Sequence, residues 1–225
     1  MAASPRPTPV YLEVGAKRVF ACSVEWPGWC RTAKDDDAAL QALGDYAARY
    51  APIAAAGGVR FPKSAADSFD VVERVKGNAT TDFGAPGVVP KLDGEPVTRA
   101  RAARQAALLR ASWAALDEAA VTAPKSLRKG PRGGGRDRDK MVQHVLGAEA
   151  AYARKLGIRH REPQLGDDAA IGALRADLLD LLGKPSDGTS PVENGWPAAY
   201  AARRIAWHVL DHVWEIEDRS DPEDD

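Results

Sequence analysis

Two histidines near the C-terminus, His208 and His212, have the residue type and the spacing of a metal site. Side chains four residues apart on a helix project from the same face, one turn above the other. Imidazole nitrogens in this arrangement can bind one divalent ion together. Because the chain contains only 4 histidines, such a pair is unusual by chance. The stretch around the pair is therefore our starting point for function.

A third histidine, His144, completes the candidate site. It lies at the edge of the apolar face of the helix predicted for residues 137–156. Three neutral imidazoles leave at least one coordination position open, which is typical of catalytic rather than structural zinc sites. An open position can acidify water or a thiol, or polarise a carbonyl group. The fourth histidine, His160, lies between two arginines just past a helix end and is interpreted as a surface residue.

Two charged residues share the face of the histidine pair and are candidate catalytic residues. At 100° per residue, Arg204 and Glu215 lie within about 40° of His208. Glu215 could accept a hydrogen bond from an imidazole or act as a general base. Arg204 could bind an anionic group of a substrate. Either side chain could instead form an exposed or intrahelical ion pair.

Four helices must bring these side chains together. Apolar residues recur at helical spacing in four stretches, separated by loops of moderate length. The stretches are residues 97–120, 137–156, 167–182 and 197–218. This pattern predicts an all-α four-helix bundle over residues 97–219. Metal sites in bundles are built from side chains on facing helices, which fits the three histidines.

The N-terminal part predicts a small sheet instead. Residues 10–14 and 17–25 alternate between apolar and other side chains, which predicts a β-hairpin. A helix opens at Asp35 and ends before Pro52 or at the following glycine pair. Residues 69–75 are a third strand candidate. The order is ββαβ, which is a plausible small α+β unit.

The predicted fold class is therefore α+β, a small N-terminal ββαβ unit followed by an all-α four-helix bundle. We expect a disordered lead at residues 1–9, the α+β domain at 10–76 and a linker or loop at 77–96. The bundle follows at 97–219, and an acidic tail closes the chain at 220–225. The middle stretch is assigned as a linker because it is rich in glycine, proline and aspartate.

The composition excludes several classes of protein. The chain has 225 residues, is 44% hydrophobic and 28% charged, and has a formal net charge of −1. Nothing in this balance favours nucleic acid or an anionic membrane. There is no apolar stretch of the roughly 20 residues that a membrane span needs, and no signal-peptide pattern at the N-terminus. Two cysteines are too few for a disulfide framework, so we expect a reducing cytoplasm, with Cys22 a buried small hydrophobe and a reactive thiol as the alternative.

The order of the histidines in the predicted bundle resembles the DinB-like superfamily. In that family one histidine on the second helix and a His-x-x-x-His pair on the fourth bind one divalent metal at the mouth of the bundle. By position, His144 matches the single histidine, and His208 and His212 match the pair. The resemblance covers about residues 95–219. It implies a zinc ion, with nickel, manganese or iron as alternatives, and a homodimer formed through bundle faces.

A second resemblance concerns the N-terminal part. The strand that ends in Trp26-Pro27-Gly28-Trp29-Cys30, followed by an alanine-rich helix, is similar to the core of HicB-like domains. In those domains a Pro-Gly-Cys-like turn leads into a helix that packs on the sheet. The resemblance covers about residues 10–55. No helix-turn-helix or ribbon-helix-helix pattern accompanies it, so a DNA-binding antitoxin role does not carry over.

Two hypotheses of function follow. The first is a metal-dependent enzyme acting on a small-molecule substrate, because DinB-like relatives include thiol-dependent transferases and isomerases and some hydrolases. A low-molecular-weight thiol bound at the metal would be its cofactor. The alternative is a non-catalytic binding or regulatory protein, in which the HicB-like domain recognises a partner and the bundle is a scaffold. No strong nucleophile accompanies the histidines, which favours the alternative.

Overall fold

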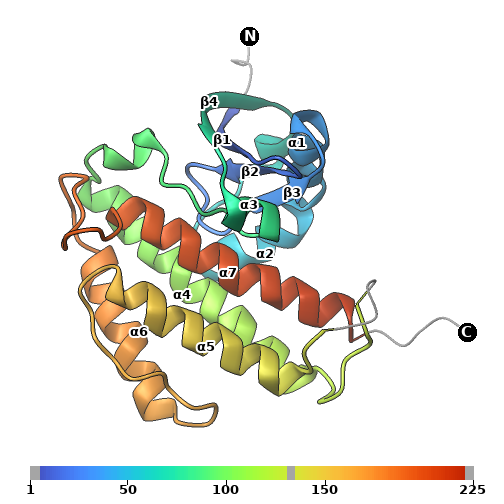
Figure 1. Ribbon diagram of the computed structural model, residues 1–225, viewed down its shortest axis with the longest axis vertical. Helices are drawn as coiled ribbons and strands as arrows, with labels where there is room; N and C mark the ends of the chain where they lie inside the picture. Colours follow the sequence, from blue (N-terminus) through green and yellow to red (C-terminus); the bar gives the residue numbers. More distant parts are fainter. Residues whose placement is uncertain (1–5, 131–134, 221–225) are drawn as a thin grey trace, which may run out of the picture.

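The computed structural model describes residues 6–130 and 135–220. It confirms the α+β fold class, with a mixed sheet in the N-terminal part followed by helices (Figure 1). Most of the predicted lead and most of the predicted acidic tail lie outside the described residues, at 1–5 and 221–225. The first strand begins at Thr8, inside the stretch predicted as the lead.

The sheet has one strand more than the sequence predicted. Its strands are β1 (Thr8–Val14), β2 (Val19–Ser23), β3 (Cys30–Ala33) and β4 (Phe69–Lys76), in the order β3-β2-β1-β4. β1 is antiparallel to β2 and parallel to β4, and β2 is antiparallel to β3. The turn before β3 contains Gly28, whose φ of 91° is easily reached only by glycine. β3 is only four residues long, too short to show an alternation in the sequence.

The single helix predicted after the sheet turn is two helices. α1 (Asp36–Asp45) and α2 (Ala47–Ala56) are separated at Tyr46, which has a non-helical ψ of 0°. Of the two predicted ends, before Pro52 or at the glycine pair Gly57-Gly58, the structure has the second, because α2 continues through Pro52 and ends at Ala56. Its buried side chains, Tyr50 and Ile53, pack into the core and outweigh the local cost of proline.

The segment predicted as a linker is bound to the sheet by carboxylates. It contains the helix α3 (Ala79–Phe83) and a short 3₁₀ turn, η2 (Lys91–Gly94). The fully buried Glu13 of β1 accepts hydrogen bonds from the backbone N–H groups of Gly87 and Val88, at 2.8 and 3.1 Å. Glu73 of β4 accepts two more from the N–H groups that open η2. This segment is therefore held in one conformation, with a further anchor at Asp93, whose carboxylate pairs with the buried Arg203.

The four helices predicted for the bundle are all present. They are α4 (Arg99–Thr122), α5 (Arg138–Arg154), α6 (Asp168–Leu182) and α7 (Ala198–Asp218). α7 runs between the sheet-bearing half and the helices α5 and α6 (Figure 1). Every residue from 198 to 210 is buried as a result. Burial of a charged or imidazole side chain is costly unless the group has a partner, so these side chains on a helix covered on all sides need specific partners.

The hydrophobic core is continuous between the two halves of the sequence. One cluster joins Leu12 of β1 and Leu43 of α1 to Leu109 of α4 and Val209 of α7. A second, smaller cluster places Trp207 of α7 against the sheet, with its ring 5.9 Å from that of Phe20 in an edge-to-face arrangement. The sheet thus fixes one side of α7, while the other side faces the bundle.

A buried carboxyl group links three helices of the bundle. Glu149 of α5 is 1% exposed and accepts a hydrogen bond from Trp113 Nε1 of α4 at 2.7 Å. Arg175 Nε of α6 donates to its second oxygen at 3.4 Å. Burial raises the pKa of Glu149 to about 7, although Arg175 opposes the shift. This group therefore makes the bundle sensitive to pH near neutrality.

We expect Glu149 to reduce stability as the pH rises. Its pKa is higher in the folded chain than the 4.5 expected when unfolded, so the folded state binds the proton more tightly. The stabilisation is fully present below pH 4.5 and is lost as the pH rises through 7. The free energy of unfolding should fall by about 3 kcal/mol from this group alone. Urea titrations at several pH values measure how the free energy of unfolding changes with pH. This dependence should be steeper in the wild type than in Glu149→Gln, and an equal pH dependence in both would contradict the raised pKa of Glu149.

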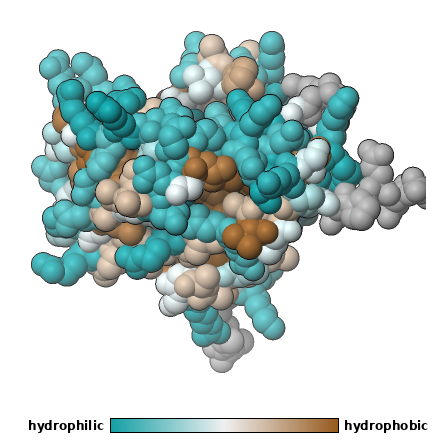
Figure 2. All heavy atoms as spheres, turned by 90° about the horizontal axis from the view of Figure 1, so that it is seen from below, coloured by the Kyte–Doolittle hydropathy of each residue, from teal (hydrophilic) through white to brown (hydrophobic). Residues whose placement is uncertain are grey.

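One face of the molecule is mainly polar. Figure 2, which views the molecule from below, shows a mainly hydrophilic face with small, separated hydrophobic patches. Among residues 6–130 and 135–220, no helix combines the length and the apolar character that crossing a bilayer requires.

Candidate metal centre

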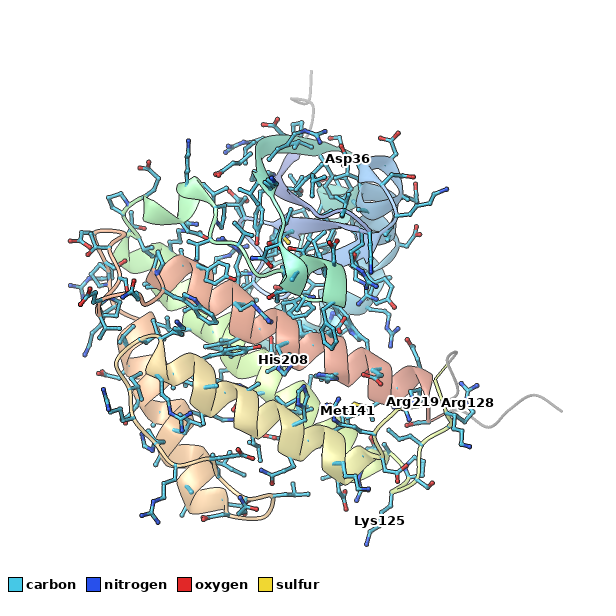
Figure 3. All side chains as sticks on the ribbon, in the orientation of Figure 1. Asp36, Lys125, Arg128, Met141, His208 and Arg219 are labelled. Atoms are coloured by element: carbon cyan, nitrogen blue, oxygen red, sulfur yellow. The ribbon has the colours of Figure 1, made fainter. Side chains whose placement is uncertain are left out.

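The three histidines converge on one point between α5 and α7. His144 comes from α5, and His208 and His212 come from successive turns of α7. One ring nitrogen from each lies within 4.8 Å of the others. The ring centroids are 4.7 to 5.1 Å apart, with the rings tilted or edge-to-face toward one another. Figure 3 shows His208 on α7 where that helix passes α5.

The spacing of the nitrogens fits a divalent ion. The Nε2 atoms of His144 and His208 are 3.3 Å apart. Two nitrogens bound to zinc at 2.0–2.1 Å and at a tetrahedral angle are separated by about 3.3–3.4 Å. The ligand atom of His212 lies within 4.8 Å of the other two, close enough for it to approach the same ion. The three histidines could therefore hold a metal, and three ligands would leave part of its coordination sphere free.

The environment keeps two of the imidazoles neutral, as metal ligands must be. Burial lowers the pKa of His144 to about 4, with a further contribution from His212. Burial also lowers the pKa of His208, and the charges of His212 and Arg204 act in the same direction. A neutral imidazole has a free lone pair at neutral pH, so these rings need not lose a proton before they bind a cation.

A chain of hydrogen bonds orients the third imidazole. His212 Nδ1 contacts Glu215 Oε2 at 3.0 Å, which leaves Nε2 as the ligand atom. The other carboxylate oxygen accepts from Arg219 Nη1 at 2.9 Å, and Arg219 Nε in turn donates to the backbone carbonyl of Arg128. The hydrogen bond to His212 lowers the pKa of Glu215, so its carboxylate stays ionised. A carboxylate behind a ligating imidazole is a common feature of metal sites.

Arg204 lies one turn before His208 and is 8% exposed. Its guanidinium lies over the rings of Tyr152 and Trp207, at 4.9 and 4.6 Å from their centroids. Nη1 is buried and has no hydrogen-bond acceptor in the part of the chain that the structure describes. The ion pair considered as the alternative for this residue is thus not found among residues 6–130 and 135–220. For Glu215, by contrast, the intrahelical ion pair with Arg219 coexists with the contact to His212.

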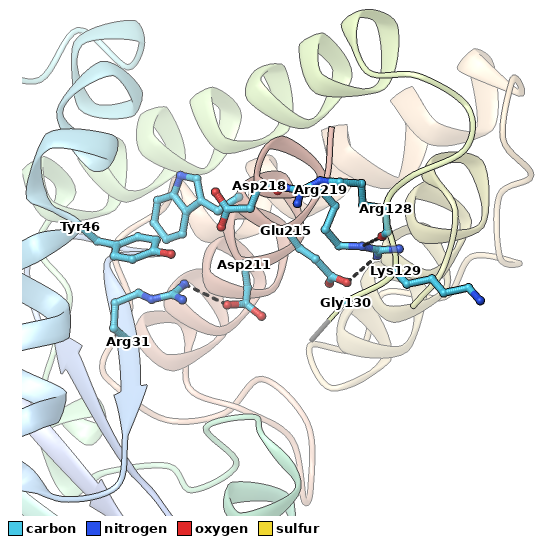
Figure 4. A pocket seen from close by; sticks show the side chains of 10 residues that line it. Arg31, Tyr46, Arg128, Lys129, Gly130, Asp211, Glu215, Asp218 and Arg219 are labelled. Atoms are coloured by element: carbon cyan, nitrogen blue, oxygen red, sulfur yellow. Dashed lines mark hydrogen bonds and ion pairs between the residues drawn. The ribbon is translucent and has the colours of Figure 1, made fainter. Parts of the chain in front are cut away.

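An open cavity borders the centre through Glu215, one of its lining residues. Its volume is about 560 Å³, within the range of small-molecule sites. Figure 4 shows this cavity between β3, the C-terminal half of α7 and the loop before α5. Its lining is Arg31, Tyr46, Arg128, Lys129, Gly130, Asp211, Trp214, Glu215, Asp218 and Arg219. Cations, carboxylates and two aromatic rings therefore face the same space.

Comparison with known proteins adds nothing to this geometry. No family model, curated protein or solved structure matches the chain. The resemblances to DinB-like and HicB-like proteins therefore stay predictions, and the site has to be interpreted from its own residues.

The structure brings the three predicted histidines together, but sequence reasoning missed their surroundings. His160 lies elsewhere, paired with Asp177 at 2.8 Å. Tyr152, whose ring is 5.7 Å from that of His208, was not among the predicted site residues. Its spacing of eight residues from His144 could have placed it two turns along the same face. The contact between Glu215 and Arg219 could have been predicted from their i,i+4 spacing. The cavity residues before α5 could not, because that stretch has no periodic pattern.

Proposed function

We propose that the chain binds one divalent metal ion through His144, His208 and His212 and acts as a metal-dependent enzyme on a small-molecule substrate. The observation that carries the proposal is the convergence of three imidazoles beside a cavity of substrate size. Zinc suits three imidazole ligands with an open position, and nickel, manganese or iron are the alternatives.

The reaction class follows from the open position and from the DinB-like resemblance. When bound, the metal would supply Lewis acidity to a thiol, a water molecule or a carbonyl group. This supports a thiol-dependent transferase or isomerase, or a hydrolase. The thiol would be a low-molecular-weight cofactor, in keeping with the predicted cytoplasmic location.

Two residues have proposed roles around the metal. Glu215 would hold the ring of His212 in the ligating orientation, and its ionised carboxylate would accept a proton at the edge of the cavity. Arg204 would bind an anionic group of the substrate, because its buried Nη1 has no acceptor among the described residues. Both roles can be tested by substitution without removing a histidine.

The activity test compares metal-loaded protein, prepared without a histidine tag, with chelator-stripped protein. Conjugation of a low-molecular-weight thiol to an electrophile and hydrolysis of activated esters should both be screened. We expect turnover only with metal, and a loss of about 100-fold in kcat in Glu215→Gln, the size typical of a lost general base. Glu217→Gln is the matched control, because Glu217 pairs with Arg49 on another side of α7.

The outcomes separate the two hypotheses. Turnover that is unaffected by stripping the metal, or by Glu215→Gln, would rule out this mechanism. Protein that loads one metal per chain but turns over no substrate would favour the non-catalytic binding protein. In that case the metal would be a structural or sensing element of the bundle.

A further inference from the structure

The chain's two cysteines lie side by side in the sheet, away from the histidines. Cys22 of β2 and Cys30 of β3 are directly opposed in the antiparallel pairing. Their Sγ atoms are 2.9 Å apart, and both side chains are buried, at 3% and 4% exposure. Both are free thiols in this structure.

The strand geometry at this pair suits a cross-strand disulfide. The neighbouring pair is hydrogen-bonded, since Ser23 N donates to Trp29 O at 3.0 Å. Hydrogen-bonded and non-hydrogen-bonded pairs alternate along an antiparallel ladder, so the cysteines occupy a non-hydrogen-bonded pair. In such a pair the Cα atoms are about 4.5 Å apart, within the range that a disulfide spans. Closing the bond therefore needs no movement of the backbone.

A small void touches both thiols. Its volume is about 10 Å³, enough for roughly one molecule the size of water. Ser23, Arg203 and Arg204 also line it, and each has a buried polar side-chain atom without a partner in the described part of the chain. The void is far too small for a bulky disulfide such as oxidised glutathione, so only a small oxidant can approach the thiols from this side.

We propose that Cys22 and Cys30 form a reversible dithiol–disulfide pair that hydrogen peroxide oxidises. Neither cysteine is a ligand of the proposed metal centre, although Arg204, which has a proposed role there, also lines the void. The two thiols are placed so that each can react with the other as soon as one is oxidised.

The chemistry balances with one hydrogen peroxide per disulfide. Cys22 reacts as its thiolate, attacks a peroxide oxygen and breaks the O–O bond. The products are a sulfenic acid and hydroxide, which takes up the proton released by the thiol and becomes water. The Cys30 thiol then attacks the sulfenic sulfur, the S–S bond forms, and the hydroxyl group leaves as a second water with the proton of Cys30. Burial raises the pKa of Cys30, which disfavours its thiolate and therefore a first attack by Cys30.

The test uses the wild-type full-length chain in its native state. After exposure to hydrogen peroxide, the protein is unfolded in an alkylating reagent and weighed. We expect a mass lower by two hydrogen atoms, no alkylated thiol, a Cys22–Cys30 linked peptide, and recovery of both thiols with dithiothreitol. The disulfide should raise Tm by roughly 5 °C, because it closes a short loop in the unfolded chain.

Single variants and a second oxidant complete the test. In Cys30→Ala the sulfenic acid at Cys22 should be trapped by dimedone, whereas in Cys22→Ala the remaining thiol should stay reduced. Oxidised glutathione should react with the native wild type far more slowly than peroxide does. The proposal is overturned if the wild type keeps both thiols after peroxide, if it reaches sulfinic acid without a cross-link, or if oxidised glutathione reacts equally fast.

Discussion

Replacing His208 and His212 together by alanine is expected to abolish binding of divalent metal at micromolar concentrations. Both imidazoles project from α7 toward His144, and together they supply two of the three nitrogens that lie within 4.8 Å. Removing one imidazole should cost about 100- to 1,000-fold in affinity, if the binding free energy of a zinc site is shared among its ligands. Removing two leaves a lone histidine, which cannot hold the ion.

Metal content should be measured by mass spectrometry on untagged protein, and affinity by competition with a chelating dye. Wild-type protein should carry one metal per chain, and His144→Ala should lose affinity to the same degree as either single variant on α7. His160→Ala is the matched control, because this histidine pairs with Asp177 away from the centre. If the double variant keeps the wild-type metal content, the proposed centre does not exist.

Asp93→Ala is expected to destabilise the fold by about 3–5 kcal/mol, the cost of leaving one partner of a buried ion pair alone. The Asp93 carboxylate is fully buried and pairs with Arg203, which is 4% exposed. Without the carboxylate, the guanidinium would keep its charge in an apolar space between the sheet and α7. The segment at 77–96 would also lose its anchor to Arg203 of α7.

Urea unfolding followed by circular dichroism measures this loss. The double variant Asp93→Leu/Arg203→Met should recover most of the lost stability, because it removes the charge rather than isolating it. Asp180→Ala is the control: its ion pair with Lys184 is 64–71% exposed and should contribute less than about 1 kcal/mol. If Asp93→Ala lowers the free energy of unfolding as little as Asp180→Ala does, the buried ion pair does not contribute to stability as proposed.

Patterns that repeat along one element were predictable from the sequence. The four bundle helices follow from apolar spacing, and the i,i+4 spacing of His208 and His212 places both rings on one face whatever the fold. The position of His144 at the edge of an apolar face was enough to expect it near that pair. These features depend on local geometry, which a single sequence carries.

Features that depend on tertiary contacts were not predictable. β3 exists because a turn at Gly28 returns the chain to β2, and its four residues have too little pattern of their own. The segment at 77–96 has a linker composition but is held by Glu13 and Glu73, whose roles appear only when the sheet is assembled. α2 passes through Pro52 because burial of its neighbours outweighs local propensity.

Because α7 contacts the sheet on one side and carries two of the three histidines, substitutions in the sheet should affect the metal centre. One side of the helix carries His208, and the adjacent Trp207 is embedded in the sheet against Phe20. A closely packed rigid rod transmits small displacements along its length instead of absorbing them. Random mutagenesis screened for altered metal affinity should therefore return substitutions in strands far from any ligand, as well as the ligands themselves.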